Sequence, residues 1–440
     1  MERQVDLARL LPDDVLAEVL RRVAPRSLAV SRCVCRAWRA LIDDRGMLHA
    51  DLLPHSLAGL FISYMNRLYA KFFARPSLDY GYRMPSDTIM DHCNGLLLLY
   101  DDWLYNPATD EVANLPERPT TPRAGMEFVS EHDVCSFLAF DPTVSSHYEV
   151  FLIPSVPWEE DIVKRAAGSA VLHSEWPPSP CILSVFSSRT GLWEDRSFSR
   201  QGEAAGTVAD IQLDQRSEPY RHAEYWRGAL YIHCQTDFVM RISSSNSTYR
   251  VIKPPIRGTE VLTRSKYPEF FLGKSEKGIY YALLDDNHRL RVWILDESCD
   301  QTQWKLRQDT DLGPFPSLSG DHGPWVLENV SSDYERKDED VYEEQMEEEF
   351  EWNSDDDNIP PTNDMEEKCD AVMRILAFHP YKEIIFLDRS SRVLAYHLSS
   401  SKLEALGNLL PNGYVTMHAY VCSSFPYTPC RMRELLQTFK

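Results

Sequence analysis

The chain has 440 residues, 43% of them hydrophobic, which is enough for a sizeable core and too long for one ordinary domain. Its formal net charge of −21 argues against nucleic-acid binding, because contacts to phosphates need clustered Lys and Arg. Residues 331–370 hold 18 acidic and three basic residues, so most of the charge is local and the remainder of the chain is only mildly acidic.

Targeting signals and metal-ligand spacings are not evident in the sequence. The first residues, MERQVDLARLL, lack the apolar stretch of a secretory signal, and runs such as GLLLLY (95–100) are too short to span a membrane. The ten cysteines are scattered and form no CxxC pair. We therefore expect a soluble protein of the cytoplasm and/or nucleus, with no cofactor, metal, nucleic-acid or membrane partner.

Two short amphipathic helices are predicted in LPDDVLAEVLRRVAPRSLAVSRCVCRAWRALI, residues 11–42. Acidic residues after Pro12 suit the positive end of a first helix, and Pro25 separates it from a second that runs from about Ser27 to Ile42. The apolar positions at helical spacing are Val15, Leu16, Val19, Leu20 and Val23 in the first helix and Val34, Trp38 and Leu41 in the second.

From about residue 57 the pattern changes to short apolar or aromatic runs separated by polar turns. Such units recur at very roughly 40–50 residues, the spacing expected of β-propeller blades. We predict an α+β multidomain chain in which a small all-α helical domain precedes a large all-β domain, most simply a β-propeller of six or seven blades. A β-sandwich or an irregular β-barrel is the structural alternative.

Four segments are predicted along the chain. The helical domain covers residues 1–46, the first part of the β domain 47–330, an acidic insertion 331–370, and the closing part of the β domain 371–440. The like charges of the insertion repel and its apolar content is low, which favours a disordered, solvated spacer. Recruitment of a basic protein, or occupation of a basic pocket by mimicry, are the alternatives.

Residues 10–46 resemble the F-box, the adaptor-binding motif of substrate receptors in cullin-RING ubiquitin ligases. The positions that carry the resemblance are Leu11-Pro12, Asp14, Val15-Leu16, Glu18, Val19-Leu20, Pro25, Ser27-Leu28, Val34-Cys35, Trp38 and Leu41-Ile42, with Val23 where Leu is common. The resemblance implies binding to a Skp-type adaptor, and through it to cullin and RING subunits. The implied adaptor-binding residues are Leu11, Pro12, Val15, Leu16, Val19, Leu20, Leu28, Val34, Cys35, Trp38 and Leu41.

The segment DHCNGLLLLYDDWLYNPATDEVANLP, residues 91–116, resembles the start of the F-box-associated β domain of plant proteins. Its matching motifs are Cys93-Asn94-Gly95-Leu96, Asn106-Pro107-Ala108-Thr109 and Leu115-Pro116, which by themselves predict turns. The two resemblances together imply a non-catalytic plant receptor whose β domain binds an unknown target protein. The alternatives are a ligase-independent interaction scaffold and a propeller enzyme such as a metal-dependent hydrolase.

Several residues are candidates for chemistry, and each also has a structural explanation. His92-Cys93 and His132-x-x-Cys135 could form a zinc site or a Cys-His catalytic pair, but we expect structural thiols. The pair Cys33 and Cys35 is read in the same way. The tryptophans expected to pack in the core rather than line a ligand groove are Trp193, Trp226, Trp293 and Trp304, and the carboxylate pairs expected in solvated turns are Asp101-Asp102 and Asp285-Asp286.

Overall fold

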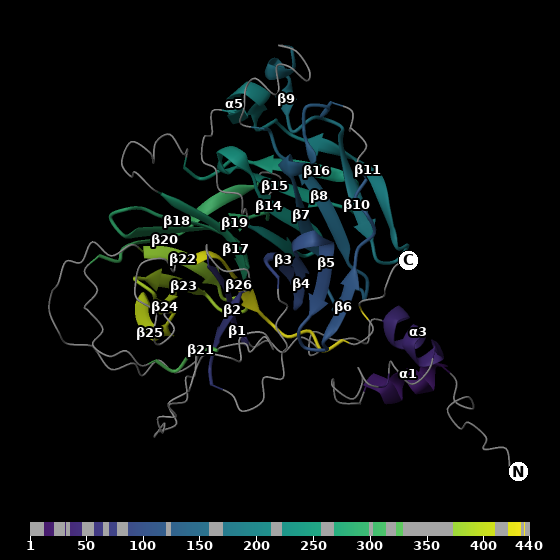
Figure 1. Cartoon of the computed structure of the whole chain (residues 1–440), viewed down its shortest axis with the longest axis horizontal. Helices are drawn as coiled ribbons and strands as arrows, with labels where there is room; N and C mark the ends of the chain where they lie inside the picture. The colour runs from purple at the N-terminus through teal and green to yellow at the C-terminus, as the bar shows by residue number, and fades with distance from the viewer. Residues whose placement is uncertain are drawn as a thin grey trace, which may run out of the picture.

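The computed structural model (Figure 1) describes most of the β domain and part of the helical segment. The described residues are 13–21, 31, 36–45, 57–64, 70–76, 87–119, 125–157, 170–212, 222–256, 268–298, 302–313, 323–328, 373–409, 421–432 and 435. Among these residues, no helix is long and apolar enough to span a membrane.

Helices are confined almost entirely to the start of the described chain. α1 (Asp13–Arg21) has two aspartates in its first turn, where the helix dipole favours negative charge. α3 (Arg36–Asp44) covers the end of the predicted second helix, whose expected start at Ser27 lies outside the described residues. α5 (Val208–Gln212) is a single short turn within the β domain. The 3₁₀ turns are η3 (Tyr100–Asp102), η4 (Glu131–Asp133), η5 (Val171–His173) and η6 (Gln235–Asp237).

After these helices the described chain is mostly β, as the sequence predicted. Of its strands, 24 fall into six groups of four antiparallel strands, and a parallel strand pair joins the third and fourth groups into one eight-stranded sheet. The first group is β1 (Gly59–Tyr64), β2 (Lys71–Ala74), β21 (Val326–Glu328) and β26 (Val421–Tyr427). The second is β3 (Ile89–Cys93), β4 (Leu96–Leu99), β5 (Trp103–Asn106) and β6 (Glu111–Asn114). The third is β7 (Val134–Ala139), β8 (Glu149–Pro154), β10 (Cys181–Ser187) and β11 (Leu192–Gln201).

The remaining three groups follow in chain order. The fourth is β13 (Ala223–Trp226), β14 (Ala229–His233), β15 (Val239–Ser243) and β16 (Thr248–Ile252). The fifth is β17 (Glu269–Ser275), β18 (Gly278–Leu284), β19 (Arg289–Asp296) and β20 (Gln303–Asp311). The sixth is β22 (Met373–Phe378), β23 (Ile384–Arg389), β24 (Arg392–His397) and β25 (Lys402–Asn408). A small sheet of β9 (Glu175–Trp176) and β12 (Gly206–Thr207) completes the set.

One strand of each group lies against its counterpart in the next group. The neighbours are β3 with β7, β7 with β13, β13 with β17, β17 with β22, and β22 with β26. Polar side chains join several of these pairs: Asp91 Oδ2 accepts a hydrogen bond from the Leu138 amide at 2.7 Å, and Glu269 Oε2 accepts one from Ile375 at 2.9 Å. Between β26 and β3, the rings of Phe425 and His92 lie 5.1 Å apart.

The first group brings the two ends of the β domain together. β1 pairs antiparallel with β26 along its whole length, from Gly59 opposite Tyr427 to Tyr64 opposite Val421. The Phe61 ring packs 5.1 Å from Tyr427 and 4.9 Å from Phe72 of β2. The N-terminal and C-terminal parts of the domain therefore share one sheet and one aromatic cluster.

The predicted turn motifs of the second group also hold the returning C-terminal segment. The buried Asn106 side chain donates hydrogen bonds to the carbonyl oxygens of Cys430 at 3.0 Å and Met432 at 3.3 Å. Gly95 has φ +90°, and a Cβ there would lie 2.5 Å from the Cys430 nitrogen. These motifs thus form turns, as predicted, and in addition contact residues 428–432, which directly follow β26.

The acidic segment 331–370 lies outside the described residues, between β21 and β22. β21 lies at one edge of the first group, where it pairs only with β2. It pairs with no strand of the fifth or sixth group, although it lies between these groups in the sequence. The chain therefore returns to the first sheet just before the acidic segment and enters the sixth group just after it. The segment boundaries and its disorder stay predictions.

Gly95→Ala and Gly202→Ala form a matched pair that tests the closure. Both glycines have φ near +90°, at +90° and +93°, but nothing lies within 4 Å of a Cβ at Gly202. Gly202→Ala should cost about 1–2 kcal/mol of unfolding free energy for the backbone conformation alone. Gly95→Ala should cost about 1–3 kcal/mol more, because its methyl group meets backbone atoms. Urea unfolding measures both, and equal losses would mean that the contact with residues 428–430 contributes nothing.

Candidate functional site

The two faces of α1 differ sharply in exposure. Leu16 is 6% exposed and Leu20 1%, whereas Val15 is 46% exposed and Val19 50%. Val15 and Val19 are four residues apart, so they lie one above the other on the same side of the helix. Two exposed β-branched residues on a helix of nine residues form a small apolar patch next to a buried apolar stripe. We call this pair the outer valines.

The inner face of α1 packs with α3 and with the β domain. Ile42 of α3 is fully buried, and Trp38 and Leu41 are partly buried against the same hydrophobic cluster. An ion pair between Asp14 and Arg45 links the start of α1 to the end of α3. The cluster that contains Leu16, Ala17, Leu20 and Ile42 continues through residues of the second and third groups to Cys430, Met432 and Leu435.

The structure places six of the eleven predicted adaptor-binding residues and divides them into two sets. Leu16 and Leu20 are buried and Trp38 and Leu41 partly buried, so these four hold the helices in place. Only the outer valines are exposed by more than a third of their surface. The other five, Leu11, Pro12, Leu28, Val34 and Cys35, lie outside the described residues. The adaptor-binding role of all eleven stays a prediction.

Buried charges meet where the second, fourth and fifth groups come together. Lys274 Nζ of β17 lies 3.4 Å from Glu224 Oε2 of β13, and their side chains are 15% and 10% exposed. The same ammonium group donates to Asn94 Oδ1 and to the Tyr225 carbonyl oxygen, each at 3.3 Å. Burial lowers the pKa of Lys274, but the Glu224 carboxylate and further neighbours outweigh it, and the net pKa is raised. This lysine therefore stays charged and joins three groups of strands.

Burial shifts the pKa of each titratable group beside Lys274 in the direction that favours its neutral form. Burial raises the pKa of Asp91 and of Glu224, with the Lys274 charge acting in the opposite direction. Burial lowers the pKa of His92 and of His222 to about 3, so neither imidazole carries a charge at neutral pH. The His222 ring stacks against Phe271 with centroids 3.8 Å apart. The cluster therefore has the character of a structural core rather than of a solvated reaction site.

Of the cysteine and histidine candidates, Cys93 takes up a structural position, and Cys33 and Cys35 lie outside the described residues. Burial raises the pKa of Cys93 to about 12, and its thiol donates to the Phe140 carbonyl oxygen at 3.2 Å. A thiol in this state lacks the thiolate that nucleophilic catalysis needs. His132 is exposed in η4, while Cys135 stands in β7. In the part of the chain that is described, no group of three or more His, Cys, Asp or Glu is arranged to hold a metal ion.

The tryptophans agree with the structural interpretation. The paired aspartates lie in turns as expected, but Asp102 and Asp285 are only 15% and 11% exposed and form ion pairs, so they are not solvated. Trp293 is 7% exposed, and Trp226 and Trp304 pack against the same cluster of the fourth and fifth groups. Trp193 packs against the hydrophobic cluster that contains Leu16 and Ile42 of the helices. Its indole NH donates a hydrogen bond to the carbonyl oxygen of Pro116 at 2.9 Å. Asp102 pairs with Arg118 at 2.5 Å. Asp285 Oδ1 accepts the amides of Asn287 and Arg289 in a hairpin turn.

Comparison with known proteins places the helices in a defined family. Residues 9–49 match the F-box domain. The F-box protein At3g07870 of Arabidopsis thaliana is 31% identical over 129 residues, which cover 24% of this chain and 30% of that protein. The F-box protein At5g07610 of the same plant is 21% identical over 342 residues, which cover 70% of this chain and 72% of that protein. The match thus spans less than a third of the first relative's length and nearly three quarters of the second's.

Solved structures give only distant similarity. A structure from a study of two prolyl endopeptidases aligns with 79% of this chain and 35% of its own, at 10% identity and a TM-score of 0.28. A similarity at this level supports no conclusion about this chain.

Removing one member of the buried ion pair should destabilise the β domain more than removing both. Lys274→Met leaves a desolvated carboxylate, so we expect a loss of roughly 3–5 kcal/mol in unfolding free energy. Adding Glu224→Gln should restore a large part of that loss. The control is Lys277→Met, because Lys277 is 51% exposed in its pair with Glu383, and such pairs contribute at most about 1 kcal/mol. Strictly additive losses in urea unfolding of the single and double variants would contradict this coupling.

Proposed function

We propose that this chain, which belongs to the F-box proteins of plants, is the substrate-recognition subunit of a cullin-RING ubiquitin ligase. In this function the helices bind a Skp-type adaptor, and through it cullin and RING subunits. The β domain binds a target protein. The chain itself supplies no catalytic group, because a separate enzyme carries the ubiquitin.

The observation that carries the adaptor half of the proposal is the exposure of the outer valines within the matched F-box residues 9–49. Isolated exposed apolar residues are common, but two on one side of a short helix whose other side is fully packed leave an apolar patch with no covering within the described chain. A partner that covers it gains the burial of both side chains. The buried face, meanwhile, keeps the helices attached to the β domain.

For the β domain we propose a six-bladed β-propeller. Six antiparallel four-stranded groups that neighbour one another in chain order support this architecture, with the third and fourth groups also joined through β11 and β16. The pairing of β1 with β26 supports closure by strands from both ends of the domain. Propellers carry their recognition residues in loops and pockets on a rigid scaffold, which suits the presentation of a target protein.

The mechanistic gain in such a complex is positional. Holding a target in a fixed relation to the adaptor raises the effective concentration of its lysines near the ubiquitin-carrying enzyme. This works only if the helices and the β domain keep a constant geometry. The single hydrophobic cluster that contains Leu16, Leu20, Met432 and Leu435 supports such a rigid connection.

The double variant Val15→Asp/Val19→Asp should abolish adaptor binding while the chain stays folded. Replacing two valines that the adaptor would cover by carboxylates should weaken binding by about 100-fold or more. Valine and aspartate have similar helix propensities and both positions are exposed, so α1 should persist. Leu16 and Leu20 are not used, because they are buried and their replacement would disrupt packing. Co-expression with a Skp-type adaptor, followed by gel filtration and titration calorimetry, measures the effect.

The matched control is Val144→Asp, because Val144 is 78% exposed in a turn of the β domain. It should bind the adaptor as the unaltered chain does. Binding that is equal in the unaltered chain and in the double variant would refute the assigned surface. Folded protein that never binds an adaptor would instead favour a scaffold that works outside a ligase.

A further inference from the structure

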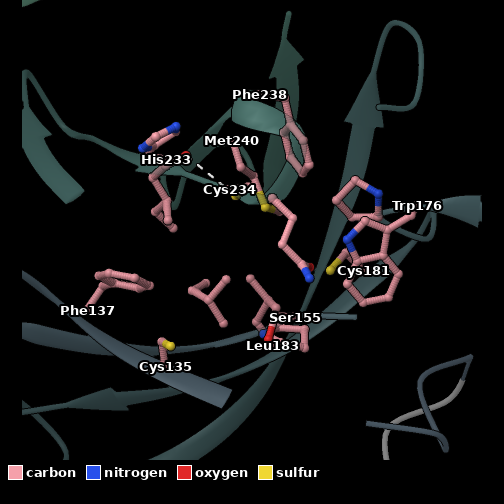
Figure 2. A pocket seen from close by; sticks show the side chains of 15 residues that line it. Cys135, Phe137, Ser155, Trp176, Cys181, Leu183, His233, Cys234, Phe238 and Met240 are labelled. Carbon is pink, nitrogen blue, oxygen red and sulfur yellow. Dashed lines mark hydrogen bonds between the residues drawn. The ribbon is translucent and has the colours of Figure 1, made fainter. Parts of the chain in front are cut away.

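A small cavity opens between the third and fourth groups of strands. It has a volume of about 40 Å³ and is lined by residues of β7, β8, β9, β10, β14 and β15. Figure 2 shows Trp176 and Cys181 on one side, Phe137 and Cys135 on the other, and Phe238 and Met240 along the upper edge. These side chains are brought together from distant parts of the sequence.

The chemistry of the wall excludes a charged occupant. None of the described residues that line the cavity is Asp, Glu, Lys or Arg. The Gln235 side chain binds both the amide and the carbonyl group of Val156, at 2.8 and 2.7 Å. His233 Nε2 lies 3.2 Å from Asp237 Oδ1, and Ser155 Oγ donates to the Asp133 carbonyl oxygen at 2.8 Å. An ion in the cavity would lose its hydration and meet no carboxylate, ammonium or guanidinium group among the described lining residues, whereas an aliphatic group gains by leaving water.

The size of the cavity limits the occupant further. A single water needs about 10–15 Å³ of such space, and an apolar cavity of about 150 Å³ accepts benzene. A cavity of about 40 Å³ lies between these limits. It suits a group of three or four carbons, such as the side chain of Leu, Ile, Val or Met, and lies well below the volume known to accept benzene.

The cavity faces away from the helices. It uses the beginning of β7 and the end of β8, at Cys135 and Ile153. The cluster that contains α1 and α3 uses the opposite ends, at Phe140 and Tyr148. Five residues along a strand separate Cys135 from Phe140, which corresponds to about 16 Å. Figure 1 shows β9, whose Trp176 lines the cavity, at the top and α1 and α3 at the lower right. A protein bound at the cavity therefore leaves the outer valines free.

From this geometry we propose that the cavity receives one aliphatic side chain of the target protein. The proposal rests on the function given above and specifies how that target is read: an uncharged segment with a Leu, Ile, Val or Met anchor. Such an anchor in a preformed apolar pocket is a common source of specificity at protein interfaces.

The first experiment uses N-acetyl-L-leucinamide and its near-isosteric polar analogue N-acetyl-L-asparaginamide as probes of the full chain. The readout is the ¹³C-methyl NMR signal of Met240, which lines the cavity, with the buried Met373 as internal reference. The leucine probe should shift Met240 and bind roughly 10- to 100-fold more tightly than the asparagine probe. N-acetyl-L-tryptophanamide should not shift it. An unmoved Met240, or equal response to the leucine and asparagine probes, would overturn the proposal.

The second experiment selects binding peptides from a random display library on the full chain. Selected peptides should share an aliphatic residue whose change to Asn lowers affinity at least tenfold. Cys234→Leu fills the cavity from one wall and Cys135→Met from another, and each should abolish both probe and peptide binding. Cys422→Leu is the control, because Cys422 is exposed on β26 and does not line the cavity. If the leucine probe binds but no such peptide is selected, the cavity is a site for a free small molecule and not for a side chain of a target protein. That outcome would overturn the assignment.

The same preparations are tested for adaptor binding, which also reports whether each variant is folded. A filled variant that binds the adaptor and still binds the peptides refutes the cavity as their site and leaves the proposed ligase function intact. If peptides bind at the cavity but the chain never binds an adaptor, the cavity is a docking site. The proposed ligase function is then refuted.

Discussion

The pairing of β1 with β26 is the constraint on which the rest of the β domain depends. It joins residues 59–64 to residues 421–427, so its entropic cost is that of closing nearly the whole domain. Backbone hydrogen bonds along the entire strand offset that cost, together with the aromatic packing of Phe61, Phe72 and Tyr427. Non-local contacts of this kind form late and cooperatively, so the domain is stable only as a whole.

The closure also determines where the helices lie. Immediately after β26 the chain passes the buried Asn106 amide and the close approach at Gly95, and both fix residues 428–432. Met432 and Leu435 then enter the cluster that holds Leu16 and Leu20. The last described residues thus connect the closing strand to the first helix. A change that loosens the closure is expected to loosen the attachment of the helices as well.

Two kinds of surface remain after this packing, and they lie apart. The outer valines face solvent on α1, while the apolar cavity opens between the third and fourth groups at the other ends of their strands. The buried pair of Lys274 and Glu224 joins strands of the fourth and fifth groups. Interaction surfaces at the periphery of a packed domain suit the receptor function proposed above.

Several features of this protein followed from its sequence alone. The helical period, the F-box pattern, the strand-and-turn texture and the turn role of Asn94-Gly95 are all local, because each depends on residues within one or two turns or strands. The structural role expected of Cys93 followed from its strand-like or turn context, and that of Trp293 from core packing as the commoner role of tryptophan in such strands.

Tertiary structure alone decided the remainder. The apolar pattern grouped Val15 with Leu16, but neighbouring helical residues point about 100° apart, and only the position of the β domain determines which of them is buried. Pairing of β1 with β26, the ion pair of Lys274 and Glu224, and the cavity lined by Cys135, Trp176 and Met240 all join residues far apart in the chain. Such contacts leave no local periodicity, because their energy arises only when the sheets have assembled.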